Sequence, residues 1–418
     1  MGAAMGRTAI LVALPLLSLS LPGCEACVAG PAEGEGEGEG EGEGEGEGEG
    51  EGEGEGEGEG EGEGEGEGDC AFSTPGSADK DRVVVLSHAT NGGTEVRTLT
   101  LSGTTLSDDG VRLDLGTDGR RIEFVPDGSL FLALGEDGVL VSVAVAAVDQ
   151  LSVVDTVALP AAGYGDLRLS ADGRVAWVVG SNVSVDTSGV YVVRVACDGT
   201  LTHEEEAGHG LRLSTSIAPL PGGRALLLGG QTAFDPIDND DTRLLSLGPP
   251  VTELAAYDLW SDAVGAARIA ASPDGALVAV PNNSMFSSLS GTVKLFSVAG
   301  DVVTELDSAT GLQTPSEVLF SPDGSLLLVS DWEADSVHVY DVSGDTLEPG
   351  DAVSGVGLAE HLAMVSRGAS AGLVLAAATN AVGNIQLLQI SAGAVTRVGQ
   401  LDLGDGIDDI PWTLAVQP

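Results

Sequence analysis

The sequence predicts an all-β protein, a seven-bladed β-propeller whose blades are four-stranded antiparallel sheets. Two observations predict this fold class. A turn motif between two apolar strands recurs along the chain at a nearly constant spacing, and the two ends of the repeating region carry complementary fragments of one further repeat. We therefore expect the C-terminal strand to complete the first blade and close the ring.

The repeated motif is an apolar strand, a Pro-Asp-Gly turn or a relative of it, and a second apolar strand. It is clearest as AASPDGALVAV from Ala270 and LFSPDGSLLLVS from Leu319. The central turn residues are Asp127, Asp172, Gly222, Asp274, Asp323 and, in a degraded copy, about Ala369, so the spacings are 45, 50, 52, 49 and 46 residues. Periods of this length with four short strands per unit are typical of propeller blades.

The two ends of the chain supply one more blade. Residues 82–87 have the pattern of a second strand with no first strand before it, and residues 95–101 follow as the third. Residues 411–418 have the pattern of a first strand that stops at the Pro of the turn motif. Joined together, these fragments bring the count to seven blades and leave no sheet edge open.

The first 23 residues are predicted to be a signal peptide. Arg7 precedes an apolar stretch, Thr8 to Leu21, that is too short to span a membrane. The sequence LPGC, which ends at Cys24, resembles the lipobox of bacterial lipoproteins, and this resemblance implies a lipid on the Cys24 thiol. We therefore expect a protein anchored to a membrane of the bacterial cell envelope, either in the periplasm or at the outer surface.

Residues 24–68 are the predicted linker, and residues 69–418 are the predicted propeller. From Glu33 to Gly68 the dipeptide Glu-Gly repeats 18 times without interruption. Glycine loses much conformational entropy on ordering, and neighbouring carboxylates repel one another. The linker is therefore predicted to be a disordered stalk.

The chain has four cysteines, which suits an exported protein in an oxidising compartment. If Cys24 carries a lipid, Cys27, Cys70 and Cys197 remain, and three cysteines cannot all pair. A Cys70–Cys197 bond would tie the end of the stalk to a turn of the propeller. A Cys27–Cys70 bond would close part of the stalk into a loop, and the sequence leaves both pairings open.

The formal net charge is −48, from 17 basic and 65 acidic residues. Residues 1–68 contribute −18, because they contain 19 Glu and one Arg, and the other −30 belongs to the repeating region. Such a field repels nucleic acid and anionic lipid headgroups, whereas it attracts cations and basic partners. Nucleic-acid binding is therefore not expected.

The run SPDGSLLLVSDWEADSVHVYDVSGDT, from Ser321 to Thr346, resembles the YVTN and lactonase-type propeller repeat of exported bacterial proteins. The resemblance extends weakly over residues 80–418. It implies the propeller fold rather than one particular function, because that broad group includes sugar-lactone hydrolases as well as binding and surface-layer proteins.

No known catalytic motif stands out. A Gly-x-Ser-x-Gly elbow, a phosphate-binding loop and a dinucleotide fingerprint are all missing outside the low-complexity part. The loop that contains Asp235, Asp238 and Asp240 offers clustered oxygen atoms for Ca²⁺, but it lacks the glycine and the closing glutamate of an EF-hand loop. A Ca²⁺ site and an ordinary Asp-rich loop are both open, and no other cofactor is expected.

Ligands of propellers bind where the loops between second and third strands, and those between blades, converge at one mouth of the central channel. Asp331, Trp332 and Glu333 are the first candidates, because a Trp between two carboxylates suits stacking on a sugar or holding a basic side chain. Packing of Trp332 under a neighbouring loop is the alternative. The other predicted binding residues at this mouth are His88, Asn91, Asn282, His361 and Trp412.

Two functions fit these features. The first is a non-enzymatic binding or scaffold module for a partner protein or a carbohydrate. The alternative is a lactonase-like hydrolase with His88 or His361 as base and Glu333 as its partner, although the predicted loops contain few Arg or Lys residues. A His, a Glu and an Arg within reach of one another would favour the hydrolase. A mouth of Asn, Asp and Trp without a cation would favour binding.

Overall fold

The three-dimensional description of the protein is a computed structural model. Its described residues are 81–88, 94–147, 150–160, 165–182, 187–208, 211, 214–229, 241–261, 265, 267–283, 287, 289–368, 370–379, 383–391, 393–404 and 410–418. The predicted signal peptide and stalk, together with Cys24, Cys27 and Cys70, lie outside these residues.

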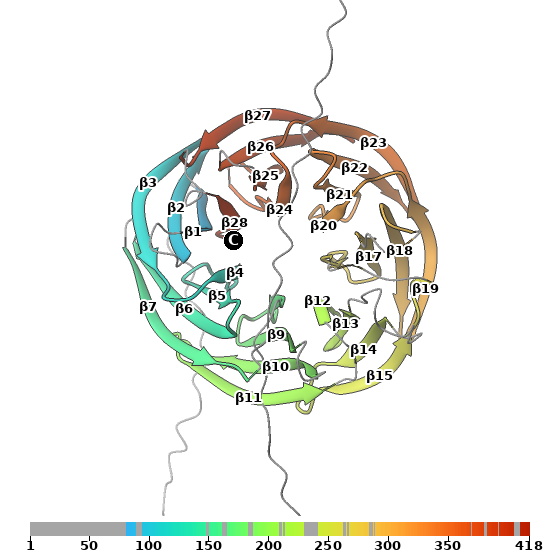
Figure 1. Cartoon of the computed structure of the whole chain (residues 1–418), viewed down its shortest axis with the longest axis horizontal. Coiled ribbons are helices and arrows are strands. Elements are labelled where there is room, and N and C mark those ends of the chain that lie inside the picture. Colours follow the sequence, from blue (N-terminus) through green and yellow to red (C-terminus); the bar gives the residue numbers. More distant parts are fainter. Residues whose placement is uncertain are drawn as a thin grey trace, which may run out of the picture. The chain divides into compact units, whose positions relative to one another are not determined.

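The described residues form seven four-stranded antiparallel sheets around a central channel, which confirms the predicted propeller (Figure 1). Each sheet is one blade. We call its strands a to d, with strand a nearest the axis and strand d at the rim. Within this part of the chain, no helix is long and apolar enough to cross a membrane.

Blade 1 consists, from a to d, of β28 (Pro411–Val416), β1 (Asp81–His88), β2 (Thr94–Ser102) and β3 (Thr105–Asp114). Blade 2 consists of β4 (Gly119–Phe124), β5 (Leu130–Gly135), β6 (Val139–Ala147) and β7 (Gln150–Ala158). Blade 3 consists of β8 (Leu167–Leu169), β9 (Val175–Asn182), β10 (Thr187–Val195) and β11 (Leu201–Gly208). Blade 4 consists of β12 (Ser214–Leu220), β13 (Arg224–Gly229), β14 (Thr242–Ser246) and β15 (Thr252–Tyr257).

Blade 5 consists of β16 (Ala270–Ala271), β17 (Leu277–Asn282), β18 (Thr292–Ala299) and β19 (Val302–Ala309). Blade 6 consists of β20 (Pro315–Phe320), β21 (Leu326–Asp331), β22 (Ser336–Ser343) and β23 (Thr346–Ser354). Blade 7 consists of β24 (Ala359–Met364), β25 (Leu373–Ala378), β26 (Asn384–Ser391) and β27 (Ala394–Asp402).

The Pro-Asp-Gly motif forms the turn between strands a and b. In blade 6, Oδ1 of Asp323 accepts hydrogen bonds from the Ser321 hydroxyl (2.6 Å) and the Ser325 N–H (3.1 Å). These bonds lower the pKa of Asp323 to about 2. Gly324 adopts a φ of 72°, a conformation that costs glycine little, and its N–H binds the Ser321 carbonyl (2.8 Å). The side chain of Asp and the freedom of Gly therefore define this turn.

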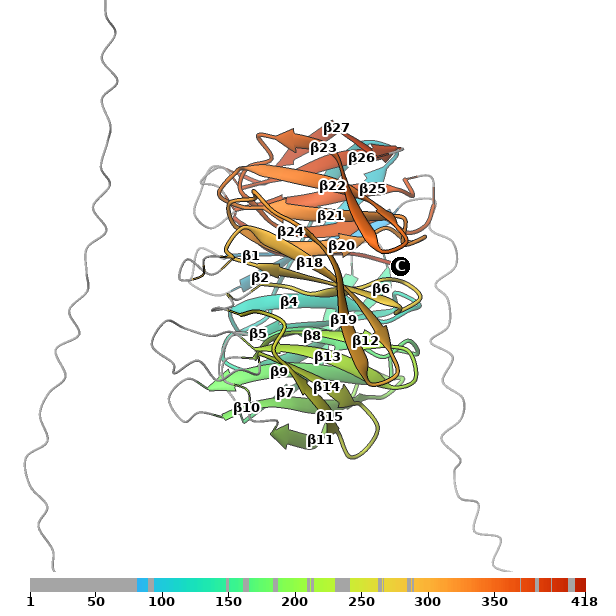
Figure 2. The ribbon, with the colours of Figure 1, turned by 90° about the vertical axis from the view of Figure 1, so that its right-hand side faces the viewer.

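The C-terminal strand closes the ring as predicted. β28 pairs with β1 in an antiparallel register from Val83–Val416 to Ser87–Pro411. The side-chain amide of Gln417 donates to the Gly128 carbonyl (2.8 Å) in the turn of blade 2. The end of the chain, marked C in Figure 2, thus lies on the face of the ring that carries the turns between strands a and b. We call it the turn face.

The hydrophobic core is divided among the interfaces between adjacent blades. Seven clusters of buried side chains each join two neighbouring blades, including one between blades 7 and 1 and one between blades 1 and 2. Both faces of a blade are therefore buried, and β5 is buried at every position of its sequence LFLALG. This explains the continuous apolar runs in the middle strands.

Carboxylates on strand d connect neighbouring blades at the rim. Asp155 accepts a hydrogen bond from the Leu201 N–H of the next blade (2.8 Å), and Asp307 does the same for Leu347 (2.8 Å). Some of the many acidic residues therefore satisfy backbone groups that the sheets leave unpaired.

Cys197, in the turn between β10 and β11, is disulfide-bonded, so it is not the unpaired cysteine of the chain. The other three cysteines, Cys24, Cys27 and Cys70, lie outside the described residues. Which cysteine is the disulfide partner of Cys197 therefore stays a prediction from the sequence.

We expect Leu414→Ala to lower the free energy of unfolding by about 2–4 kcal/mol, because the side chain of Leu414 is 1% exposed in the cluster between blades 7 and 1. Urea unfolding measures the change. Leu254→Ala, on the rim strand β15 and 41% exposed, is the matched control and should change the value by less than about 0.5 kcal/mol. Equal effects of the two substitutions would contradict a closed, buried β28.

Candidate active site in the central channel

One position of strand a is polar in all seven blades. In six blades the residue that follows strand a binds, through its N–H, a carbonyl at the start of strand b, as Ser321 binds Leu326 (2.9 Å) and Gln417 binds Arg82 (2.8 Å). In blade 4 the equivalent residue is Leu220, the last of β12, which pairs with Arg224 at the start of β13. Counting back four residues from this residue in each blade gives the equivalent position, and we call these seven residues the inner ring. From blade 1 to blade 7 the inner ring is Thr413, Arg121, Asp166, Ser216, Arg268, Glu317 and His361.

A β-bulge precedes the inner-ring residue in five blades. In β4, β12, β20, β24 and β28 the pairing with strand b skips the residue just before it, which is Glu360 in β24 and Trp412 in β28. A bulge bends its strand and re-aims the side chains beside it. The recurring bulge therefore gives the inner ring an orientation that regular strands would not.

Asp166 contacts neighbouring polar residues on one side of the inner ring. Its carboxylate is 1% exposed and accepts hydrogen bonds from the Ser216 hydroxyl (2.7 Å) and the Ile217 N–H (3.2 Å). Nitrogen atoms of Arg121 and Arg168 each lie 3.5 Å from one of its oxygens. Burial alone would raise the pKa of Asp166, but Arg168 and Arg121 outweigh burial and hold the pKa below its ordinary value.

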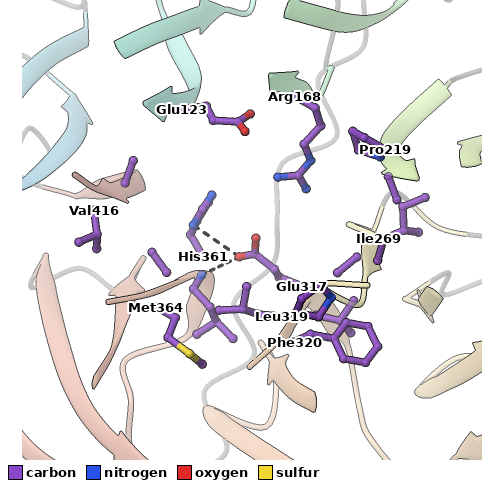
Figure 3. A pocket seen from close by; sticks show the side chains of 18 of the residues that line it. Glu123, Arg168, Pro219, Ile269, Glu317, Leu319, Phe320, His361, Met364 and Val416 are labelled. Atoms are coloured by element: carbon purple, nitrogen blue, oxygen red, sulfur yellow. Dashed lines mark hydrogen bonds and ion pairs between the residues drawn. The ribbon is translucent and has the colours of Figure 1, made fainter. Parts of the chain in front are cut away.

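Glu317 joins the other side (Figure 3). Its Oε1 accepts a hydrogen bond from Arg268 (3.1 Å). Its Oε2 accepts one from the Leu362 N–H (2.6 Å) and lies 3.5 Å from Nδ1 of His361. Burial raises the pKa of Glu317 above its ordinary value, even though Arg268 and the Leu362 N–H favour the carboxylate.

His361 is neutral at pH 7. Burial lowers the pKa of His361 well below its ordinary value, and the positive charges of Arg268 and Arg121 lower it further. Nδ1 lies 3.5 Å from Glu317, so the neutral tautomer that carries its proton on Nδ1 faces the carboxylate and keeps a lone pair on Nε2. The imidazole can then accept a proton from a bound molecule.

Two arginines keep their charge in the channel. Burial opposes the charge on Arg168, but Asp166 and Glu123 outweigh burial and raise the pKa of Arg168. Burial and then Arg268 lower the pKa of Arg121 to about 9, which leaves it protonated at pH 7. This acidic molecule therefore presents guanidinium groups at its centre.

A cavity of about 480 Å³ adjoins the inner ring, within the range of small-molecule sites (Figure 3). Glu317 and His361 line it, together with the side chains two residues beyond each inner-ring position, which we call the lower layer. From blade 1 to blade 7 the lower layer is Ala415, Glu123, Arg168, Ala218, Ala270, Leu319 and Ala363. Its alanines leave the space that forms the cavity.

Among the described residues, four buried polar atoms of the inner ring and lower layer have no hydrogen-bond partner: Nε of Arg121, Oε2 of Glu123, Nδ1 of His361 and Oγ1 of Thr413. Such an atom costs about 1–3 kcal/mol. Burial raises the pKa of Glu123 to about 7, although Arg168 opposes the shift. Unpartnered buried groups and strongly shifted pKa values in a cavity are both typical of functional sites.

The predicted segment 331–333 lies away from this cavity, at the end of β21. Asp331 is 1% exposed and accepts hydrogen bonds from the N–H groups of Gln313 (2.9 Å) and Thr314 (2.7 Å). Nε1 of Trp332 donates to the hydroxyl of Thr379 in blade 7 (3.0 Å). Asp331 and Trp332 thus make contacts within the protein, while Glu333 is exposed.

Three other predicted residues are described, and only one of them lines the cavity. Asn282 is fully buried, and its amide donates to the Ser287 hydroxyl (3.3 Å). Trp412 stacks against the guanidinium of Arg120, 4.2 Å from the ring centre. His361 does belong to the cavity, but its partner is Glu317 rather than the predicted Glu333, because both lie on adjacent inner strands.

The remaining predicted residues lie outside the described part of the structure. These are the side chain of His88, and Asn91, Asp235, Asp238 and Asp240. The proposed Ca²⁺ loop therefore stays a prediction. Within the described ranges, no group of three or more His, Cys, Asp or Glu side chains is arranged to hold a metal ion.

Most of the inner ring is not predicted from the sequence, because binding residues of propellers are expected in loops. Arg121, Asp166, Arg268 and Glu317 instead lie in or directly beside the inner strands. The repeat itself contains the signal, since counting back six residues from Asp127 or Asp323 reaches Arg121 or Glu317. An aligned column of charged residues in the innermost strand points to the channel.

Residues 240–365 match the family model described as lactonase, 7-bladed beta-propeller, which confirms the resemblance over this stretch. A search of curated protein sequences finds no significant match.

Solved structures share the fold along most of the chain. The periplasmic gluconolactonase of Pseudomonas aeruginosa is 17% identical, with a TM-score of 0.64, and the match covers 81% of this chain and 99% of that one. A candidate 6-phosphogluconolactonase from Bacteroides uniformis is 17% identical, with a TM-score of 0.64 and coverage of 81% and 100%. A Lactobacillus plantarum protein is 14% identical, with a TM-score of 0.65 and coverage of 81% and 100%. At such identities the likeness shows the fold alone.

We expect Glu123→Gln to change the pH dependence of stability. The pKa of Glu123 is about 7 in the folded protein against an ordinary value of 4.5. The folded state thus binds this proton more tightly, and the resulting stability is lost as the pH rises from about 4.5 through about 7. Glutamine does not titrate, so the variant should gain about 1–3 kcal/mol over wild type at pH 8 compared with pH 5.

Urea unfolding at the two pH values measures this gain. The exposed Glu333→Gln is the matched control. The result is the difference between the gains in the free energy of unfolding of the two variants. A gain for Glu123→Gln no larger than that of the control would contradict the raised pKa.

Proposed function

We propose that this protein hydrolyses lactones in its central channel. The observation that carries the proposal is the contact of Glu317 with both Arg268 and His361 at the wall of a cavity. A His, a Glu and an Arg within reach of one another are the groups that this reaction needs. The match of residues 240–365 to the lactonase-type propeller model supports the same activity.

His361 is the proposed general base. Its neutral imidazole takes a proton from a water molecule through Nε2, while Glu317 orients the ring from Nδ1 and stabilises the imidazolium that forms. Arg268 holds Glu317 in place through its other oxygen. This division of roles follows from the three contacts without any movement of the strands.

Arg168 is the proposed donor to the developing oxyanion. Attack of water on the lactone carbonyl places negative charge on the carbonyl oxygen, and Arg168 lines the cavity with its charge retained. When the ring C–O bond breaks, the protonated His361 returns the proton to the ring oxygen. The product is a hydroxy acid, whose carboxylate the guanidinium groups also attract.

We expect His361→Gln to lower kcat/KM for lactone hydrolysis by about 10²–10⁴-fold, the range that a general base contributes. Acid release from a panel of γ- and δ-lactones, followed in a pH-stat with purified full-length protein, measures it. His203→Gln is the matched control, because His203 lies on the rim strand β11. Wild-type rates for His361→Gln would refute the role of the base.

The position of the protein in the cell is a second part of the proposal. The signal sequence, the LPGC motif and the Glu-Gly stalk support export and lipid anchoring at Cys24 in the cell envelope. The stalk would hold the propeller away from the membrane surface. A binding or scaffold role toward a protein or carbohydrate, and Ca²⁺ at Asp235, Asp238 and Asp240, stay predictions from the sequence.

We expect Cys24→Ser to abolish labelling by a fatty-acid analogue during expression in a bacterial host and to move the protein from the membrane fraction to the soluble fraction. The lipid is the anchor in this proposal, so its loss removes the main membrane affinity. Cys27→Ser is the matched control and should keep the label. Labelled, membrane-bound Cys24→Ser protein would contradict anchoring at this residue.

A further inference from the structure

The cavity has a polar side and an apolar side. In Figure 3, Glu123 and Arg168 lie on one side of the pair formed by Glu317 and His361. On the opposite side the labelled side chains are apolar, with Met364 among them. A substrate whose carbonyl contacts the pair must therefore place the rest of its atoms against one of two different surfaces.

The apolar side is built by blades 4 to 7 together with blade 1. Its wall consists of the lower-layer residues Ala218, Ala270, Leu319, Ala363 and Ala415, with Met364 beyond them toward the turn face. Five consecutive blades therefore contribute only one large side chain, Leu319, to the lower layer. The wall is at once roomy and without charge.

Ser272 is the one polar side chain on this side among the described lining residues, and the turn of blade 5 uses it. Its hydroxyl donates to Oδ1 of Asp274 (2.6 Å) and accepts a hydrogen bond from the Leu277 N–H (2.9 Å). The hydroxyl therefore has no second proton to offer a ligand. Backbone groups on the inner edges of the strands occur all around the channel. The side chains therefore determine which substrate groups each side of the cavity binds.

From this asymmetry we propose that the substrate is a lactone with an unbranched alkyl chain, and that the chain lies along the apolar side toward the turn face. The inference rests on the proposed hydrolase function and names its substrate class. Each methylene buried against this wall should raise kcat/KM by roughly fourfold. Each substrate hydroxyl buried there without a partner should lower it by roughly tenfold.

Four lactones with the same six-membered ring test the proposal: δ-valerolactone, δ-hexalactone, δ-decanolactone and glucono-δ-lactone. With purified full-length protein, we expect kcat/KM to rise at least roughly tenfold from δ-hexalactone to δ-decanolactone. Glucono-δ-lactone, with hydroxyl groups around its ring, should be the poorest substrate. Enzyme-free rates are subtracted for each compound.

The outcomes separate the two proposals. Hydrolysis in which glucono-δ-lactone equals or exceeds δ-decanolactone, or in which chain length has no effect, overturns the substrate class while the hydrolase function stands. Hydrolysis of none of these or of the other γ- and δ-lactones overturns the hydrolase function, and the substrate class falls with it.

Two substitutions on the apolar wall sharpen the test. Leu319→Asn should lower the ratio of kcat/KM for δ-decanolactone to that for δ-valerolactone by roughly tenfold, because it puts an amide against the chain. Leu254→Asn, on the rim strand β15, is the matched control and should keep the wild-type ratio. Ala363→Leu fills part of the wall and should also lower the ratio. An unchanged ratio in both wall variants overturns the proposal.

Discussion

The pairing of β28 with β1 is the contact on which the rest of the molecule depends. Each blade buries both of its faces, so any break in the circle would expose two apolar surfaces to water. Closure also assembles the channel. His361 belongs to blade 7 and Arg121 to blade 2, and blade 1, which β28 completes, lies between them. The positive charge of Arg121 therefore acts on His361 across blade 1 only in the closed ring.

The channel concentrates charges that the rest of the molecule could not stabilise. Buried ions are costly unless they are paired and hydrogen-bonded. Here Asp166 lies 3.5 Å from nitrogen atoms of two arginines, and Glu317 accepts a hydrogen bond from Arg268 while it contacts His361. Asp166 and Arg168 both belong to blade 3, but the other partners come from different inner strands, so no blade holds a complete site. A chain with net charge −48 can thus hold three arginines at its centre, one each from blades 2, 3 and 5.

The fold could be predicted from the sequence because the repeat is long, regular and complementary at its ends. The site could be predicted only in part. His361 is a predicted site residue, whereas its partner Glu317 is not, because Glu317 lies on an inner strand and the sequence predicts binding residues in loops. In blade 7 the degraded motif was also misplaced. Val365 there binds Leu373, so the longer turn makes Arg367, and not Ala369, the equivalent of Asp323. Burial and pKa shifts depend on contacts between blades, so no local sequence pattern predicts them.

The order of strands in blade 1 has a mechanical consequence for the anchoring proposed at Cys24. β1 lies between β28 and β2, so the chain that precedes Asp81 enters the ring at an interior strand. Tension along that segment would load two rows of backbone hydrogen bonds in shear, and both rows must yield together. A strand at the rim would instead peel away one bond at a time. The position that closes the circle is thus also the one best suited to withstand a pull.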